Sequence, residues 1–285
     1  MIGSLAGPLF ALVSAFGYGV SDFVGGIASR RVAALRVVLV SYPVALVLLA
    51  GLAAVIGGHI TGPAIFWGAL CGISQAFGVW WFYAALGSGP ISVVSPLTAI
   101  LVAGVPVIAG VIGGERPALI ANIGIVVALV AVFMVSREAT DADVTPHRFT
   151  TKVAWLTVGS GLAFGLNFVL IHQAPEEAKL WPLVIARLSA SLLVVVVALL
   201  TRDLALPTGQ PLRLALLAGV LDTVANVAML LALQASLLSL AGVLISLYPA
   251  GTVLLAIVVL KERVTRWQTL GMVLALAAVA MIAIG

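Results

Sequence analysis

Three ionisable residues, Asp22, Arg187 and Asp222, lie well inside long apolar segments of the sequence. A charged side chain in the hydrocarbon of a membrane costs at least about 2.5 kcal/mol on insertion scales, so such residues generally mark a functional pathway. A carboxylate at such a position can bind an ammonium group or relay a proton, and a guanidinium can bind a carboxylate. These residues are therefore the first candidates for chemistry.

The depth of each charge follows from the helical rise of about 1.5 Å per residue. Asp22 and Asp222 are eight and nine residues from basic residues that flank their segments on the same predicted face of the membrane. Both carboxylates should therefore lie about 12 to 13 Å below that face. Arg187 follows Lys179, on the opposite face, by eight residues. In a hydrocarbon core roughly 30 Å thick, the three charges are expected near the midplane.

Each charge also has a structural interpretation. Arg187 could extend its head group to the interface, as its counterpart in the repeat described below, Arg36, could from its place near a segment start. Asp22 could bond the hydroxyl of Tyr18 or Ser21 and serve only packing. For these two residues both interpretations stay open, whereas we favour a functional role for Asp222, in the middle of its segment.

Neutral polar and aromatic residues in the same segments complete a predicted substrate-binding set. Asn226 is four residues after Asp222 and should share its helix face. We favour Trp80 as a wall of this site over Trp81 and Tyr83, which lie near a segment end where aromatic belts occur. The predicted set comprises Tyr18, Asp22, Gln75, Trp80, Ser95, Asn167, Arg187, Asp222, Asn226 and Ser246.

The composition excludes an ordinary soluble domain. Of 285 residues, 63% are hydrophobic and 8% are charged, and the mean hydropathy is +1.26; soluble domains have about 45–50% apolar and about 25% charged residues. The 78 residues between Arg36 and Glu115 contain no Asp, Glu, Lys or Arg, which is room for three spans of roughly 20 residues. The apolar runs are continuous rather than alternating, which favours helices over a barrel. The net charge of +4 then indicates basic loops rather than a nucleic-acid partner.

Glycine, proline and charged residues divide the apolar sequence into ten predicted spans. The predicted spans are 5–27, 35–56, 64–86, 91–113, 117–136, 153–173, 180–200, 212–235, 238–260 and 264–284. Prolines inside the fourth and ninth spans could act as hinges or as fixed packing elements.

The sequence repeats itself at a fixed offset of 147 residues, which relates Glu115 to Glu262, Gly72 to Gly219 and Gln75 to Asp222. Such an echo indicates an internal repeat. Five spans per half force the second half to insert upside down. We therefore predict an all-α integral membrane protein with ten transmembrane helices in two inverted five-helix repeats. The predicted bounds are 1–136 for the first repeat, 137–152 for a polar connecting loop and 153–285 for the second repeat.

Motifs near the hairpins carry a resemblance to a known family. The first half contains Ala85-Leu86, then Gly89-Pro90-Ile91-Ser92-Val93-Val94-Ser95-Pro96, then Gly114-Glu115-Arg116-Pro117; the second contains Tyr248-Pro249 and Lys261-Glu262-Arg263. The chain resembles the EamA-like branch of the drug/metabolite transporter superfamily over almost its whole length. The resemblance implies ten helices, an inverted repeat, a central cavity lined mainly by helices 1, 3, 4, 6, 8 and 9, and export or exchange of small metabolites such as amino acids. It does not indicate the substrate, and the second hairpin departs from the first by having Lys261 in place of glycine.

Several functions lack their sequence signatures. The chain contains no GxxxxGK[ST] phosphate loop and no HExxH motif, and His59, His147 and His172 are not paired at ligand spacing. ATP-driven transport and intramembrane metalloproteolysis are therefore disfavoured. We assign no catalytic residue, no metal ligand and no cofactor, with proton coupling as the one open addition.

The residues therefore favour a secondary transporter that moves a small polar or amphipathic metabolite, with an amino acid the preferred substrate, outward by alternating access. We expect a multi-pass protein of the plasma (inner) membrane, acting as a monomer or weak homodimer. The alternatives are a drug or nucleotide-sugar carrier of the same fold, an integral-membrane enzyme acting on lipid, and a non-transporting scaffold. The lipid enzyme would need an interfacial nucleophile or metal set, and the sequence shows none.

Orientation and hairpin geometry give two further expectations. Eleven basic residues are predicted on one face and two, Arg116 and Lys179, on the other. Positive residues prefer the cytoplasm, so both termini should be outside, whereas the family resemblance implies termini inside. The Glu115-Arg116 and Glu262-Arg263 turns lie at hairpin tips and are predicted to set hairpin geometry rather than to touch substrate.

Overall fold

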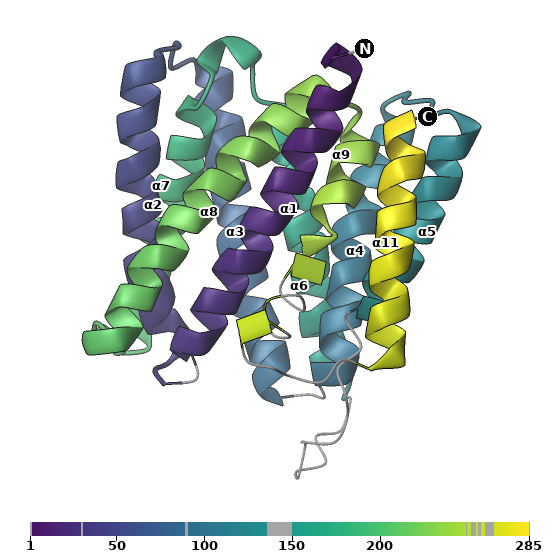
Figure 1. Cartoon of the computed structure of the whole chain (residues 1–285). Coiled ribbons are helices and arrows are strands. Elements are labelled where there is room, and N and C mark those ends of the chain that lie inside the picture. Colours follow the sequence, from purple (N-terminus) through teal and green to yellow (C-terminus); the bar gives the residue numbers. More distant parts are fainter. Residues whose placement is uncertain are drawn as a thin grey trace.

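The chain was analysed as a computed structural model that describes residues 2–29, 31–88, 91–135, 150–248, 250–251, 255, 258–259 and 265–284. Within these ranges the regular secondary structure is entirely helical (Figure 1). Six helices are long and apolar enough to cross a membrane, and α4, α5 and α11 contain shorter apolar stretches. These helices confirm the predicted helical membrane class.

The helices follow the predicted spans closely. In the first half they are α1 (Ile2–Ser29), α2 (Ala34–Ile56), α3 (Gly62–Ser88), α4 (Ile91–Ile112) and α5 (Leu119–Val135). In the second half they are α6 (Thr151–His172), the 3-10 turn η2 (Glu176–Ala178), α7 (Trp181–Leu200), α8 (Gly209–Ala235), α9 (Leu238–Ile245) and α11 (Arg266–Ile284). Most ends differ from the predicted ends by three residues or fewer because glycine, proline and polar residues mark them.

The ninth predicted span is wrong as a single continuous helix. Helix α9 ends at Ile245, where Ser246 and Leu247 form a turn. Pro249 has no N–H with which to bond the carbonyl of Ile245, which removes a hydrogen bond that a continuous helix would need. In α4, by contrast, the helix continues through Pro106, whose ring packs against Gly242 of α9. For Pro106, this contact favours fixed packing over a hinge.

The two halves of the chain interlock rather than lying side by side. Figure 1 shows α1 running alongside α8, and α3 makes the corresponding contact with α6. The pairs α2–α7, α4–α9 and α5–α11 also each join one helix from each half. If α1 to α5 are matched with α6, α7, α8, α9 and α11, these contacts map onto one another. A site at the centre of the bundle therefore draws on both halves.

Glycines allow two related helix contacts to come close. A Cβ added to Gly72 on α3 would lie 1.9 Å from the carbonyl oxygen of Ala186 on α7. A Cβ added to Gly219 on α8 would lie 2.7 Å from the carbonyl oxygen of Ser41 on α2. No real Cβ tolerates such distances, so both positions require glycine. The two contacts are repeat equivalents, because Gly72 and Gly219 are 147 residues apart and Ser41 and Ala186 are 145 apart.

This alignment corrects one sequence interpretation. An offset of 145 residues between α2 and α7 pairs Arg187 with Tyr42. The sequence-based pairing of Arg187 with Arg36 is therefore wrong. Arg187 and Tyr42 therefore occupy equivalent places on two helices that pack against each other. This placement matters for the candidate site described below.

Contacts at both ends of the bundle tie α2 to the α7 region. At one end Arg36 Nε lies 2.7 Å from Asp203 Oδ1. At the other end Lys179 Nζ donates to the carbonyl of Ile56 at 2.8 Å, and the backbone N–H of His59 donates to the carbonyl of Glu177. These contacts join α2 of the first half to the α7 region of the second half at both ends of the bundle.

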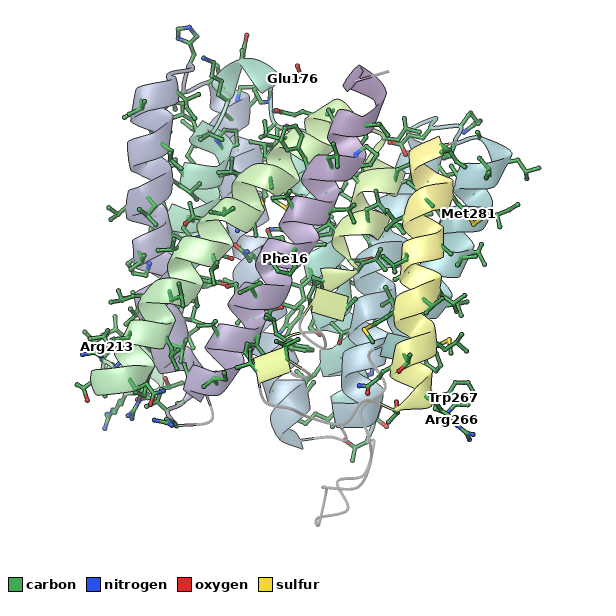
Figure 2. The ribbon with its side chains drawn as sticks, viewed as in Figure 1. Phe16, Glu176, Arg213, Arg266, Trp267 and Met281 are labelled. Atoms are coloured by element: carbon green, nitrogen blue, oxygen red, sulfur yellow. The ribbon has the colours of Figure 1, made fainter. Side chains whose placement is uncertain are left out.

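The basic residues gather at one end of the molecule. In Figure 2, Arg213 and Arg266 lie at the end of the bundle opposite Glu176, and Figure 1 places both termini at the Glu176 end. The structure thus agrees with the charge asymmetry read from the sequence. By the positive-inside rule, the end with Arg213 and Arg266 should face the cytoplasm.

Cysteine labelling of intact cells tests this orientation. We expect His59→Cys, exposed at the termini end, to react with a membrane-impermeant maleimide, and Thr208→Cys, exposed at the basic end, to stay unlabelled until the membrane is permeabilised. The native Cys71 is buried and should contribute little background. Labelling of Thr208→Cys but not of His59→Cys in sealed cells would contradict this orientation and show the opposite one.

Candidate functional site

The centre of the bundle contains an ion pair between α7 and α8. Arg187 Nη2 lies 2.6 Å from Asp222 Oδ2, and the two side chains are 2% and 18% exposed. Asp222 is the middle residue of α8, with thirteen residues on either side of it. The alternative in which Arg187 extends to the interface is therefore wrong, because its guanidinium is buried in the bundle against a carboxylate.

The guanidinium of Arg187 is held from a second side by α2. Its Cζ lies 4.5 Å from the centroid of the Tyr42 ring, which is a cation–π geometry. Arg187 Nη1 is buried and has no hydrogen-bond partner among the residues that the structure describes. The side chain is therefore fixed by a carboxylate and an aromatic face, while one of its nitrogens keeps its donors unused.

Helix α1 contributes Tyr18 and Asp22. The Tyr18 hydroxyl is 3.4 Å from Met229 Sδ on α8, and its position is close enough to interact electrostatically with Asp222 and Arg187. Asp22 interacts electrostatically with Asp222 and Tyr248. Within the described part of the chain, no hydrogen bond or ion pair of the Asp22 carboxylate is found.

The purely structural interpretation of Asp22 lacks its expected partners. Ser21 donates to the carbonyl of Ala218 at 3.0 Å, and Tyr18 is directed to Met229. Both hydroxyls thus bond α8 rather than the neighbouring carboxylate. The Asp22 carboxylate therefore has no hydrogen-bonded partner among the described residues; the residue is exposed and interacts electrostatically with Asp222.

Three of the predicted amide and hydroxyl side chains are satisfied by backbone. Asn167 Nδ2 donates to the carbonyl of Cys71 on α3 at 3.0 Å, which joins α6 to α3. Asn226 donates to the carbonyl of Asp222, four residues earlier, at 2.8 Å. Ser246 donates to the carbonyl of Val243 at the end of α9. Of these three bonds, the one from Asn167 joins two helices, whereas those from Asn226 and Ser246 link residues three or four positions apart.

The remaining predicted residues lie on α3 and α4. Gln75 is half-buried, one turn after Cys71. Trp80 is 51% exposed and stacks on Phe77 with ring centroids 6.3 Å apart. No contact of Trp80 with the ion pair is present among the described residues. The side chain of Ser95 lies outside the described residues, as do Glu262 and Arg263.

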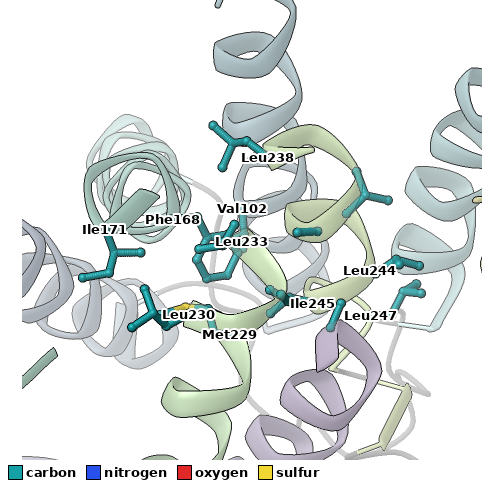
Figure 3. Packing of buried hydrophobic residues seen from close by; sticks show 14 of the residues in the cluster. Val102, Phe168, Ile171, Met229, Leu230, Leu233, Leu238, Leu244, Ile245 and Leu247 are labelled. Carbon is teal, nitrogen blue, oxygen red and sulfur yellow. The ribbon is translucent and has the colours of Figure 1, made fainter. Parts of the chain in front are cut away.

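Figure 3 shows a packed cluster of buried apolar residues that several helices share. It brings together Phe168 of α6, Leu233 of α8 and Leu238 and Leu244 of α9, all nearly inaccessible. Phe168 and Leu233 lie near the C-terminal ends of α6 and α8, Leu238 begins α9 and Leu244 lies near its end.

The carboxylate of Glu115 binds the N-terminus of α9. Glu115 Oε1 accepts the backbone N–H of Leu238 at 2.5 Å, and Oε2 accepts that of Ser239 at 3.0 Å. The first N–H groups of a helix lack partners within it, and a carboxylate there also complements the helix dipole. Gly110 makes room for this carboxylate, because a Cβ there would lie 2.2 Å from Glu115 Oε2. The predicted structural role of the first Glu-Arg turn thus gains a physical basis.

We expect Glu115→Gln to lower protein stability by about 1 to 2 kcal/mol, because an amide has only one acceptor oxygen and no charge to offer the N-terminus of α9. Thermal unfolding and a transport assay would check this, with Arg116→Gln at the exposed neighbouring position as the control. The protein level or transport rate should change more than the apparent substrate affinity. A pure affinity defect at normal expression would contradict the structural role.

The arrangement supports binding and proton chemistry. The Arg187–Asp222 pair lies at the centre beside Tyr42, and it interacts electrostatically with Tyr18; Asp22, an exposed residue, interacts electrostatically with Asp222. Such a set can receive an ammonium group, a carboxylate or a proton. Within the described residues, no group of three His, Cys, Asp or Glu side chains is placed to hold a metal ion.

Sequence reasoning missed three participants. Tyr42 was hidden among apolar neighbours, although the correct α2–α7 offset would have matched it to Arg187. Cys71 is not among the predicted site residues, and both its carbonyl and its thiol contact Asn167. Tyr248 enters the sequence analysis only as part of a motif. Its electrostatic interaction with Asp22 does not follow from the sequence spacing of the two residues.

A bundle of apolar helices with a charged centre drawn from both halves defines the class as a multi-pass membrane protein. The sequence model described as "EamA-like transporter family" matches residues 5–137 and again 151–284. The chain therefore belongs to the EamA-like transporter family, within the drug/metabolite transporter superfamily, and has the two-repeat architecture of that family.

A solved structure confirms the fold independently. The structure titled "Crystal structure of protein" has a TM-score of 0.77 to this chain at 14% identity, covering 96% of this chain and 95% of that one. At this identity the likeness shows the fold alone. No match was found among curated proteins.

Proposed function

We propose that this protein is a secondary active transporter that exports a small polar or amphipathic metabolite, with an amino acid as the preferred substrate. The single observation that carries this proposal is the buried Arg187–Asp222 pair at the centre of the bundle. Buried charge is expensive in a membrane protein and generally serves a substrate or ion pathway. A scaffold would have no use for it, which favours transport over that alternative.

The chemistry of the centre suits a zwitterion. Asp22 and Asp222 offer negative charge to an ammonium group, and Arg187 offers positive charge to a carboxylate. This complementarity favours an amino acid over a nucleotide sugar or a purely apolar drug, which lack one or both groups. A proton moving through Asp222 is the coupling ion that we propose, and no bound cofactor is required.

The architecture supports alternating access. We propose ten spans in two inverted repeats, with bounds near 1–136 and 153–285 around a 137–152 loop, because equivalent helices make equivalent contacts. Rocking one half against the other would then expose the central site to each side in turn. We place the protein in the plasma (inner) membrane, as a monomer or weak homodimer.

Transport by the purified protein tests this function. Proteoliposomes should exchange at least one member of a panel of radiolabelled amino acids, and protein-free liposomes should not. Arg187→Gln should lose that flux if the central pair is the site. Absence of flux for every amino acid tested would contradict the proposed substrate, and flux of nucleotide sugars or organic cations instead would favour the alternative carriers.

A further inference from the structure

We infer that Arg187 is an anion-binding residue that exchanges Asp222 for the carboxylate of a ligand, and that this exchange is linked to protonation of Asp222. The inference rests on the proposed function in that it concerns the same central site. Beyond the proposed function, it identifies the Arg187 atoms that bind the carboxylate of the ligand. It also explains why a proton binds together with that carboxylate.

The first observation is the incomplete use of the guanidinium. A guanidinium offers five N–H donors in a planar fork. Asp222 reaches only Nη2, through one oxygen at 2.6 Å. Nη1 is buried and unpartnered, on a side chain that is 2% exposed. Buried donors are rarely left unused, and an exception calls for an explanation such as a missing ligand.

A ligand carboxylate would use this fork more fully than Asp222 does. Bidentate carboxylates bond two guanidinium nitrogens at once, which is among the strongest polar pairings in proteins. The Tyr42 ring, 4.5 Å from Cζ, holds the guanidinium plane in place. Asp222 is the partially exposed member of the pair, so we expect a ligand to approach from its side and displace it.

Displacement leaves Asp222 without its counter-charge. The charged or titratable groups that face it are Arg187 of α7 and the Tyr18 and Asp22 side chains of α1. Around these lie Tyr42 of α2 beside Arg187, Cys71 of α3 near Tyr18 and Arg187, and Tyr248 near Asp22. Once Arg187 is taken by the ligand, Asp222 loses its compensating charge while it still interacts with Asp22, and both burial and a nearby like charge disfavour an ionised carboxylate.

A proton is therefore expected to bind Asp222 when an anion binds Arg187. By thermodynamic linkage, the proton and the anion then strengthen each other's binding by the same factor. The ligand carboxylate should bind more tightly at acid pH, where Asp222 is more easily neutralised. Asp222→Asn should mimic the protonated state and open Arg187 to anions at every pH.

Formate, the smallest carboxylate, tests this without knowledge of the substrate. The assay is thermal unfolding of the purified full-length chain over a range of sodium formate concentrations, with sodium chloride at matched ionic strength as the reference. We expect formate to stabilise Asp222→Asn with an apparent dissociation constant at least about tenfold lower than for the wild type at pH 8. The double variant Arg187→Gln/Asp222→Asn should lose this response, and Asp203→Asn, which removes the partner of Arg36 in an exposed pair, should behave like the wild type.

A second measurement covers the case in which Asp222→Asn does not fold alone. Formate should then restore its yield during expression or purification, and the wild type should bind formate more tightly at pH 5 than at pH 8. The inference is overturned if formate stabilises neither Asp222→Asn nor the wild type at pH 5 beyond the chloride reference. It is also overturned if the double variant responds as the single variant does. Because no transport is measured, this outcome is separable from failure of the proposed function.

Discussion

Asp222→Leu is expected to destabilise the folded protein by about 3 to 5 kcal/mol, because it leaves the Arg187 guanidinium buried without a counter-charge. The side chain of Arg187 is 2% exposed and cannot recover the lost partner from water without rearrangement. The measurement is the thermal or denaturant unfolding of the purified protein in detergent. This is the largest stability effect that the structure predicts for a single polar side chain.

The matched control uses another ion pair of the described residues, Arg36–Asp203. Arg36 Nε lies 2.7 Å from Asp203 Oδ1, which is also a short contact, but the two side chains are 37% and 26% exposed. Asp203→Leu should therefore cost at most about 1 kcal/mol. The double variant Arg187→Met/Asp222→Leu should recover most of the loss, because replacing both members of a buried pair removes the unpaired charge. Equal losses at Asp222 and Asp203 would contradict the buried-pair account.

The positions of most helices could be predicted from the sequence because clear helix-ending residues separate the apolar segments. Glycine, proline and charged residues stop the apolar runs, so the ends of helices such as α2 and α7 fall within a residue or two of expectation. The exception, α9, shows the limit of that reasoning. A proline within an apolar run does not show by itself whether the helix ends there, because α4 continues through Pro106 whereas α9 ends at Ile245, four residues before Pro249.

The candidate site was partly readable for a different reason. Depth estimated from helical rise placed Arg187 and Asp222 near one level, and the structure joins them at 2.6 Å. Rotation of a helix about its axis is not fixed by depth, so sequence reasoning left interfacial extension of Arg187 open. The orientation of Arg187 depends on Gly72 and Gly219, whose close contacts set how α2 and α7 meet the neighbouring helices.

Side-chain hydrogen bonding was the least readable feature. Asn167, Asn226 and Ser246 were predicted to face a substrate, and their predicted binding roles stay predictions. In this structure their hydrogen bonds go to the carbonyls of Cys71, Asp222 and Val243. A sequence shows which donors exist, but the choice between a ligand and a nearby carbonyl depends on tertiary placement.

The second large effect concerns transport. Asp222→Asn is expected to abolish proton-coupled accumulation while leaving counterflow exchange, because the neutral amide imitates the protonated acid and cannot cycle a proton. If Asp222 instead only binds the ammonium group of the substrate, accumulation and exchange should weaken together. The two roles of Asp222 are therefore separated by one variant measured in two modes.

The most direct test of the central claim, that the Arg187–Asp222 pair is the transport site, is a side-by-side assay of wild type and Asp222→Asn. Both proteins are reconstituted at equal amounts, and uptake of the best-transported labelled amino acid is measured with an imposed proton gradient and in counterflow. We predict accumulation by the wild type only, with exchange by both proteins if Asp222 carries the proton. Concentrative transport by Asp222→Asn at the wild-type level would contradict the claim and leave Asp222 with a structural role.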